Sequence, residues 1–299
     1  MIYGGSILVD SSINISRATG IPEMVIGATV VSIATTLPEL LVTVYSCYKG
    51  LPDLAVGNAV GSMLFNLTLI VGLCIAFLPQ KIDYKNTLLN IGFLFVGSLL
   101  FYIFVADGDF SRWQGLILIG VFIASLICNV ISGKKKVVEV SKVFSLEKKD
   151  SIWKNIALFI LGTAMVAIGA DFLVKHGEIL ARSLGIGEHI IGVTVIAIGT
   201  SLPDLVTAIN SIKLKKTSIA IGNTVGANII NSTLLVGLSS QFGSGKILIT
   251  PNVIYFAMPM LFASLLILFL PIAIKKRTYR WQGVLLLIIT VTYYLTLLL

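Results

Sequence analysis

The chain has 299 residues, of which 56% are hydrophobic and only 12% are charged. Soluble domains carry roughly a quarter charged residues, so this composition excludes an ordinary soluble protein and predicts that lipid faces most of the surface. The net charge of +8 would suggest nucleic acid for a soluble chain, but here the basic residues lie between apolar segments. That placement favours anionic lipid, and we expect no nucleic-acid partner.

Ten apolar segments follow one another along the chain, and each is predicted to form a membrane-crossing helix. The first is short, because about 20 residues are needed to cross a bilayer, and we expect this helix to be truncated or to begin further upstream. The expected helices span about residues 1–17, 21–48, 54–78, 86–106, 112–132, 153–183, 187–211, 219–240, 251–273 and 280–298.

The predicted fold class is an all-α polytopic membrane protein with about ten transmembrane helices. Its organisation follows from an internal repeat: the stretch Ile26–Ser46 recurs as Ile191–Ser211, 165 positions later and without a gap. Ten of these 21 positions are identical. We therefore divide the chain into a five-helix repeat in residues 1–132, a linker in residues 133–151 and a second five-helix repeat in residues 152–299.

Five helices per repeat is an odd number, so the two repeats must cross the membrane in opposite directions, as in many secondary transporters. If the linker 133–151 is cytoplasmic, 17 of the 22 lysines and arginines lie on the cytoplasmic side and five lie outside. This bias agrees with the positive-inside rule. We expect a multi-pass protein of the plasma or inner membrane with a cytoplasmic linker and with both termini facing outward.

Each repeated stretch places a proline and an acid in the middle of an apolar helix, at Pro38-Glu39 and at Pro203-Asp204. A proline inside a helix removes an N–H donor and frees the carbonyl four residues before it, so the second and seventh helices should be broken at the midplane. Freed carbonyls and buried carboxylates are costly in lipid unless something satisfies them, and a cation can do so. The same turns carry hydroxyls at Thr35, Thr36, Thr200 and Ser201.

A second motif, GNxxG followed by asparagine, begins at Gly57 and again at Gly222. Its polar residues Asn58, Ser62 and Asn66 are spaced by four and lie on one helix face, matched by Asn223, Ala227 and Asn231 in the other repeat. We expect Asn66 beside Glu39 and Asn231 beside Asp204, with both acids brought to one site.

Taken singly, a proline kink, a glycine pair or a buried asparagine is commonly structural. A carboxylate in the membrane is different, because it costs roughly 2.5 kcal/mol or more and marks a functional site by default. Both motifs also occur twice in register. Oxygen ligands of this kind suit hard cations such as Ca²⁺ and Na⁺, and there is no histidine or cysteine cluster to suggest a softer metal.

The motifs T-x-L-P-E-L at Thr35 to Leu40 and T-S-L-P-D-L at Thr200 to Leu205, with the GNxxG segments, resemble the α-repeats of the calcium/cation antiporter superfamily. The resemblance covers almost the whole chain and is strongest to the compact prokaryotic sodium/calcium exchanger group. It implies ten membrane helices, a central cation site and exchange of Ca²⁺ for Na⁺ by alternating access. It also implies that helices one and six slide as gates.

By motif position the resemblance makes Glu39 and Asp204 the main Ca²⁺ carboxylates. Side-chain oxygens would come from Ser62, Asn66 and Asn231. Flanking Na⁺ sites would be shaped by Thr35, Thr36, Thr200, Ser201 and the backbone carbonyls near Ser32 and Ala197.

The chain departs from this family at several positions. Many members carry an acid at one of the positions of Asn66 and Asn231, whereas this chain has asparagine at both, so that its site holds two carboxylates. Two carboxylates neutralise one Ca²⁺, but the number of Na⁺ ions is left open, and H⁺ or K⁺ remains an alternative coupling ion.

Two further classes stay as alternatives. A cation channel would need a continuous polar pore and no counter-ion. An intramembrane aspartyl protease would need two aspartates, whereas here one acid is Glu39. The expected protein is thus a transporter without enzymatic activity, resident cofactor or obligatory protein partner, acting on calcium and sodium ions in the lipid bilayer.

Overall fold

The computed structural model describes residues 2–79, 84–106, 109–140, 152–183, 197–242, 246–248, 251 and 253–298. Nearly all of this chain is helical, because long apolar segments in lipid must satisfy their backbone groups within themselves. The helical elements, with η marking a π-helical segment, are α1 (Ile2–Thr19), α2 (Glu23–Ile26), η1 (Gly27–Val31), α3 (Ser32–Thr35), α4 (Leu37–Tyr48), α5 (Pro52–Leu64), η2 (Phe65–Ile70), α6 (Val71–Phe77), α7 (Tyr84–Phe104), α8 (Arg112–Val140), α9 (Ile152–Ser183), α11 (Ala197–Thr200), α12 (Leu202–Lys213), α13 (Thr217–Ile229), η4 (Ile230–Leu235), α14 (Val236–Ser239), η5 (Val253–Ala257), α15 (Met258–Lys275) and α16 (Arg280–Leu298).

The expected helices are present wherever the structure describes the chain, although residues 187–196 of the seventh lie outside the described part. One end is wrong: the fifth helix was expected to stop near residue 132, but α8 continues to Val140. The lysines that follow Gly133 suggested a connector, yet lysine is a good helix former and extends the helix by two turns.

Six of the described helices are long and apolar enough to cross a membrane by themselves, and a seventh span results if the bent pair Glu23–Thr35 and Leu37–Tyr48 is taken as one. The six are Leu54–Phe77, Lys85–Phe104, Arg112–Gly133, Ile152–Gly169, Thr217–Ser239 and Val253–Lys275.

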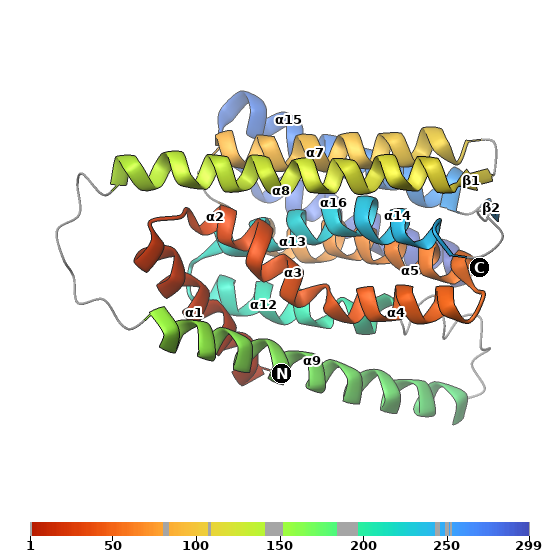
Figure 1. Ribbon diagram of the computed structural model, residues 1–299, viewed down its shortest axis with the longest axis horizontal. Coiled ribbons are helices and arrows are strands. Elements are labelled where there is room, and N and C mark those ends of the chain that lie inside the picture. The colour runs from red at the N-terminus through yellow and green to blue at the C-terminus, as the bar shows by residue number, and fades with distance from the viewer. Residues whose placement is uncertain are drawn as a thin grey trace.

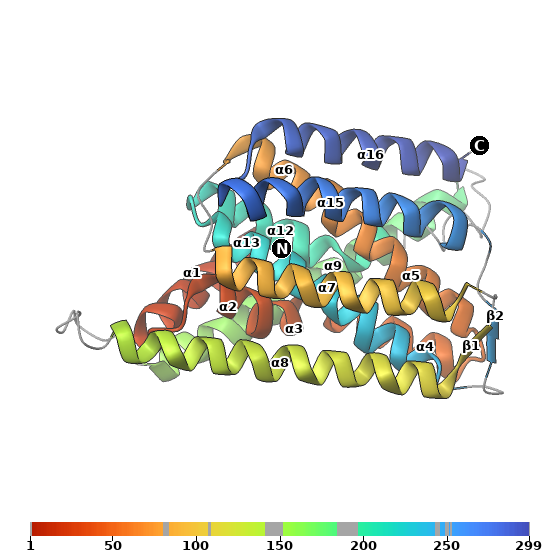
Figure 2. The ribbon, with the colours of Figure 1, turned by 90° about the horizontal axis from the view of Figure 1, so that it is seen from above.

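The helices lie in layers (Figure 1). Helices α7 and α8 form one face, α9 lies on the opposite face, and the broken helices α2–α4 and α12 run between them. Figure 2, turned by 90°, places α16 and α8 at opposite edges. The site-bearing segments are therefore surrounded by other helices, and the most apolar ones face outward.

The two halves of the chain are interlocked through glycines. A Cβ on Gly283 of α16 would lie 2.6 Å from the carbonyl oxygen of Gly72 in α6, and a Cβ on Gly115 of α8 would lie 2.7 Å from that of Gly237 in α14. Such contacts require the absence of a side chain. The last helix of each half, α8 or α16, thus packs against a helix of the other half.

Two contacts show which ends of the helices lie together. The three-residue strands β1 (Asp109–Ser111) and β2 (Lys246–Leu248), which an all-helical prediction did not include, pair in antiparallel fashion. Lys216 Nζ, after α12, lies 2.7 Å from Glu23 Oε1 at the start of α2. The end of α12 therefore meets the beginning of the broken helix of the first half, so these two segments run in opposite directions.

Candidate cation-binding site

Each acid stands in the first turn of a helix that follows a break. Helix α3 ends at Thr35 and α4 begins at Leu37, with a bend of 45°. The linking residue Thr36 has φ −86° and ψ 4°, and Ser201 between α11 and α12 has nearly the same angles, φ −83° and ψ 0°. Proline at the start of α4 and α12 makes both breaks, as the sequence predicted.

Glu39 and Asp204 are both fully buried, with 0% of their surface exposed. Ser201, which lies three residues before Asp204, donates a hydrogen bond of 3.3 Å to Glu39 Oε1. The acid of the first half is thus in contact with the turn that carries the acid of the second half. Glu39 Oε2 is buried and has no hydrogen-bond partner among the described residues.

Asp204 is held by two amides. Asn66 Nδ2 donates to Asp204 Oδ2 at 2.8 Å, and Asn223 Nδ2 donates to Asp204 Oδ1 at 2.9 Å. The expected pairing of Asn66 with Glu39 is therefore wrong, because the Asn66 amide is bonded to the acid of the other half. Asn231 was expected beside Asp204, but neither of its amide atoms has a hydrogen-bond partner among the described residues.

The threonines before the breaks also reach across the halves. Thr35 Oγ1 donates to Asn223 Oδ1 at 3.0 Å, and Thr200 Oγ1 donates to Asn58 Oδ1 at 3.4 Å. Each threonine of one half thus meets the GNxxG asparagine of the other. Asn223 donates through its nitrogen and accepts through its oxygen, so it joins Thr35 to Asp204.

The crossed pairing follows from close helix packing. Helix α13 contacts α2, η1 and α3 of the first half. A Cβ on Gly222 would lie 2.5 Å from the carbonyl oxygen of Met24, and one on Gly27 would lie 2.7 Å from that of Ile219. Gly222, which begins the GNxxG motif of the second half, lets the backbones touch, so the asparagine next to it reaches the broken helix of the opposite half.

Several buried oxygens around the acids have no partner among the described residues. Besides Glu39 Oε2 they include Ser62 Oγ, Asn66 Oδ1 and Asn231 Oδ1. Asn66 and Asn231 lie in the π-helical segments η2 and η4, which are related by the repeat offset of 165 residues, and such segments are frequent at functional sites. Unpaired buried oxygens are costly, and a hard cation would satisfy them.

The other predicted site residues lie at the breaks. Thr36 Oγ1 donates to the carbonyl oxygen of Ser32 at 2.6 Å, so that carbonyl already has a partner. Ala197 is the first residue of α11, and its side chain is outside the described part. In the part of the chain that the structure describes, no three His, Cys, Asp or Glu side chains come together.

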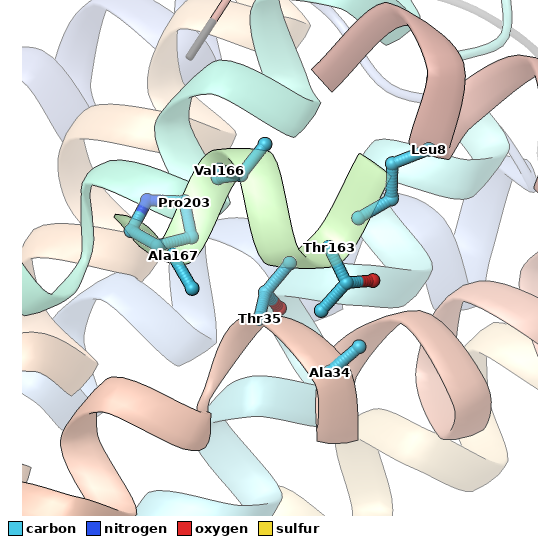
Figure 3. Close-up of a pocket in the computed structure, with 7 residues that line it drawn as sticks. All are labelled: Leu8, Ala34, Thr35, Thr163, Val166, Ala167 and Pro203. Carbon is cyan, nitrogen blue, oxygen red and sulfur yellow. The ribbon is translucent and has the colours of Figure 1, made fainter. Parts of the chain in front are cut away.

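A small pocket adjoins the site on the side of α1 and α9 (Figure 3). Thr35 and Pro203 of the two breaks face Thr163 of α9 and Leu8 of α1 across it. Ala34, Val166 and Ala167 complete its lining. The pocket lies where the two helices outside the repeated motifs cover the broken helices.

Sequence reasoning left Asn58 and Asn223 out of the candidate ligands, although both contact the threonines of the site. Their signal was present, because they begin the row of polar residues spaced by four that ends at Asn66 and Asn231. Position on a helix face does not tell which neighbouring helix that face meets.

A family model described as sodium/calcium exchanger protein matches residues 1–131 and 154–299. The chain is 33% identical over 291 residues to an uncharacterized membrane protein of Methanocaldococcus jannaschii, with 96% of this chain and 91% of the relative covered. It is 28% identical over 334 residues to the sodium/calcium exchanger MaX1 of Methanosarcina acetivorans, with 99% and 95% covered. A solved structure of the sodium-calcium exchanger NCX_Mj, soaked with Na⁺ and Sr²⁺, matches with a TM-score of 0.81 at 31% identity, covering 97% of this chain and 92% of that one. The chain belongs to the sodium/calcium exchanger protein family, which is a family of membrane transporters and not of enzymes.

Proposed function

We propose that this protein exchanges Ca²⁺ for Na⁺ across the cell membrane, by alternating access at one site built from Glu39 and Asp204. Membership of the sodium/calcium exchanger family supports the exchange. The observation that carries the site is that the turn bearing Asp204 contacts the Glu39 carboxylate through Ser201, in a place where both acids are fully buried.

The charge of the site explains why two fluxes would be coupled. Glu39 and Asp204 are the only buried acids of the described residues, and no lysine or arginine there is buried. An empty site with two charges is costly to carry through a low-dielectric barrier. One Ca²⁺ neutralises it, as do Na⁺ ions, so only the loaded site changes sides.

The ligands divide into two groups in this proposal. Ca²⁺ binds the two carboxylates with the oxygens of Ser62, Asn66 and Asn231, which have no other partner among the described residues. Na⁺ ions occupy the flanking turns. Their ligands are Thr35, Thr36, Thr200, Ser201 and the carbonyls near Ser32 and Ala197.

The membrane arrangement in this proposal is ten spans in two inverted repeats, residues 1–132 and 152–299, joined by a cytoplasmic linker at 133–151. The pair of Lys216 with Glu23 supports it, because both residues stand at helix ends that this orientation places on the cytoplasmic side. The pairing of β1 with β2 supports it as well, since this orientation places both segments outside. Both chain ends then face outward.

In this proposal the small pocket between Thr35, Pro203 and Thr163 lies beneath the gates. Helices α1 and α9, which cover this pocket, act as the sliding gates. Close contact supports their moving together: a Cβ on Gly162 of α9 would lie 2.7 Å from the backbone nitrogen of Leu8 in α1.

The test is uptake of ⁴⁵Ca²⁺ into proteoliposomes that are loaded with Na⁺ and diluted into Na⁺-free buffer. Uptake should require the outward Na⁺ gradient and should vanish in Glu39→Gln and in Asp204→Asn. Glu23→Gln is the matched control, because this glutamate lies in a partly exposed ion pair away from the site and should leave uptake intact.

The same assay separates the coupling ions. If an outward H⁺ or K⁺ gradient drives uptake to the same extent as an outward Na⁺ gradient, the proposed site is retained but the coupling ion is different. Uptake that needs no counter-ion would identify a channel and refute exchange. Uptake that persists in both carboxylate variants would refute this site.

A further inference from the structure

Most buried hydroxyls of the described residues bond to a carbonyl of their own helix. Thr68 donates to Leu64, Thr224 to Ala220 and Ser264 to Met260, each four residues back. This is the usual arrangement for serine and threonine inside a helix.

Of the seven fully buried hydroxyls that have no hydrogen-bond partner among the described residues, three lie on the α12–α13 hairpin. Thr207, Ser211 and Thr217 are 0% exposed, and their side-chain oxygens have no hydrogen-bond partner among the described residues. An unpaired buried hydroxyl costs free energy. Three of them in one hairpin call for a ligand with hydrogen-bonding capacity.

These hydroxyls form a row that begins at the cation site. Asp204, Thr207 and Ser211 are spaced by three and four residues, so they lie on one face of α12. The bond from Asn223 Nδ2 to Asp204 Oδ1 sets α12 against α13, and the bond from Lys216 N to Ser211 O closes the turn between them. At about 1.5 Å per residue, Ser211 lies about 10 Å from Asp204 along the helix. Thr217, the first residue of α13, directly follows the turn that the bond from Lys216 to Ser211 closes.

We propose that this row is a narrow file of water molecules that links Asp204 to the cytoplasmic side, separate from the pocket that α1 and α9 cover. Water fits because each hydroxyl can both donate and accept, and because buried polar groups without protein partners usually bind water. The lining of that pocket supports the separation, because it includes Pro203 of α12 but none of Thr207, Ser211 and Thr217.

A buried hydroxyl without a partner also follows Glu39, the acid of the first half. Thr43 lies four residues after Glu39 on α4, is 0% exposed and has no partner for its hydroxyl among the described residues. It is not the repeat equivalent of Thr207, since its counterpart is Ala208. An unpaired hydroxyl thus follows each acid, although the two hydroxyls do not occupy equivalent positions of the repeat. This points to a common role in binding water and not to simple inheritance from the duplication.

The inference uses the proposed orientation but not transport itself, so its test does not depend on activity. Thr207→Cys and Ser211→Cys are placed singly in a background whose native cysteines Cys47, Cys74 and Cys128 are replaced. Membrane vesicles of each orientation are treated with Ag⁺, a small thiol-reactive cation. Free thiols are then counted with a maleimide after denaturation.

We expect Ag⁺ from the cytoplasmic side to abolish maleimide labelling of both cysteines, and Ag⁺ from the outside to leave it intact. Thr224→Cys is the matched control, a buried position on the same hairpin whose hydroxyl is already bonded to Ala220, and it should stay labelled. Equal labelling of Ser211→Cys and Thr224→Cys after cytoplasmic Ag⁺ would overturn the proposal. Loss of maleimide labelling only when Ag⁺ is added from the outer side would also overturn it. Failure of Ca²⁺ uptake would not alter this readout, so the two proposals fail separately.

Discussion

Asn66 of the first half donates a 2.8 Å hydrogen bond from its Nδ2 to Asp204 Oδ2 of the second half. The geometry leaves Asn66 Oδ1 without a partner among the described residues, while Ser201 of the second half bonds Glu39 of the first. The two halves thus complete one another's polar groups. Neither half by itself could form this arrangement.

Removing the Asn66 amide should therefore weaken Ca²⁺ binding. Asn66→Ala deletes one oxygen of the proposed site and frees one oxygen of Asp204, and we expect the apparent Ca²⁺ affinity to fall about 10- to 100-fold, as for other residues that orient ligands. The measurement is the Ca²⁺ dependence of Na⁺-driven uptake.

The control for Asn66 is Asn90 of α7. Its side-chain amide forms two hydrogen bonds with the side-chain amide of Asn129 in α8, at 3.0 and 2.9 Å. Asn90→Ala leaves a buried amide unpaired and should lower the free energy of unfolding by about 1–3 kcal/mol without changing the Ca²⁺ affinity. If both variants change the Ca²⁺ affinity equally, Asn66 is not a specific component of the Ca²⁺ site.

Bound Ca²⁺ should stabilise the folded protein. A ligand that binds only the folded state adds about 2.7 kcal/mol at 100 times its dissociation constant, so the melting temperature should rise with Ca²⁺. Glu39→Gln and Asp204→Asn should lose this rise, whereas Glu23→Gln should keep it. A rise of equal size in the two carboxylate variants would place the binding elsewhere.

The repeat-related glycines Gly222 and Gly57 should respond in opposite ways to alanine. A Cβ on Gly222 would meet the Met24 carbonyl oxygen at 2.5 Å, whereas one on Gly57 would have no atom within 4 Å. We expect Gly222→Ala to destabilise the protein by about 1–3 kcal/mol, the usual cost of overpacking. Gly57→Ala should be neutral or stabilising by up to about 1 kcal/mol, because alanine favours a helix. Thermal unfolding in detergent compares them, and equal melting temperatures would contradict the packing.

The contact between Glu23 and Lys216 makes a prediction about sidedness. Cysteines introduced by Glu23→Cys and by Lys216→Cys should react with a membrane-impermeant thiol reagent from the cytoplasmic side only. Lys49→Cys, at the exposed end of α4, should react from the outside only. Labelling of all three positions from one side would refute the inverted orientation.

The ion pair itself should contribute little. Both side chains are partly exposed, at 33% and 24%, so a double-mutant cycle should give a coupling of about 0.2–1 kcal/mol that falls with added salt. The contact is informative about topology far more than about stability.

Local sequence was enough to define the helices and the points where two of them break. Apolar runs of membrane length can only be helical in lipid, and Pro38 and Pro203 remove the same backbone donor wherever the chain folds. The same reasoning marked Glu39 and Asp204, because a carboxylate within such a run has no inexpensive structural explanation. The structure places both of them, fully buried, at the breaks.

Which half supplies each contact was decided only by tertiary packing. An internal repeat makes Glu39 and Asp204 equivalent, so the pattern around Asn66 is compatible with either acid, and the expected partner was the wrong one. The outcome depends on the close approach of Gly222 to Met24 and of Gly27 to Ile219, which seats α13 on the broken helix of the opposite half. Such a contact joins residues nearly 200 positions apart, and no local periodicity contains that information.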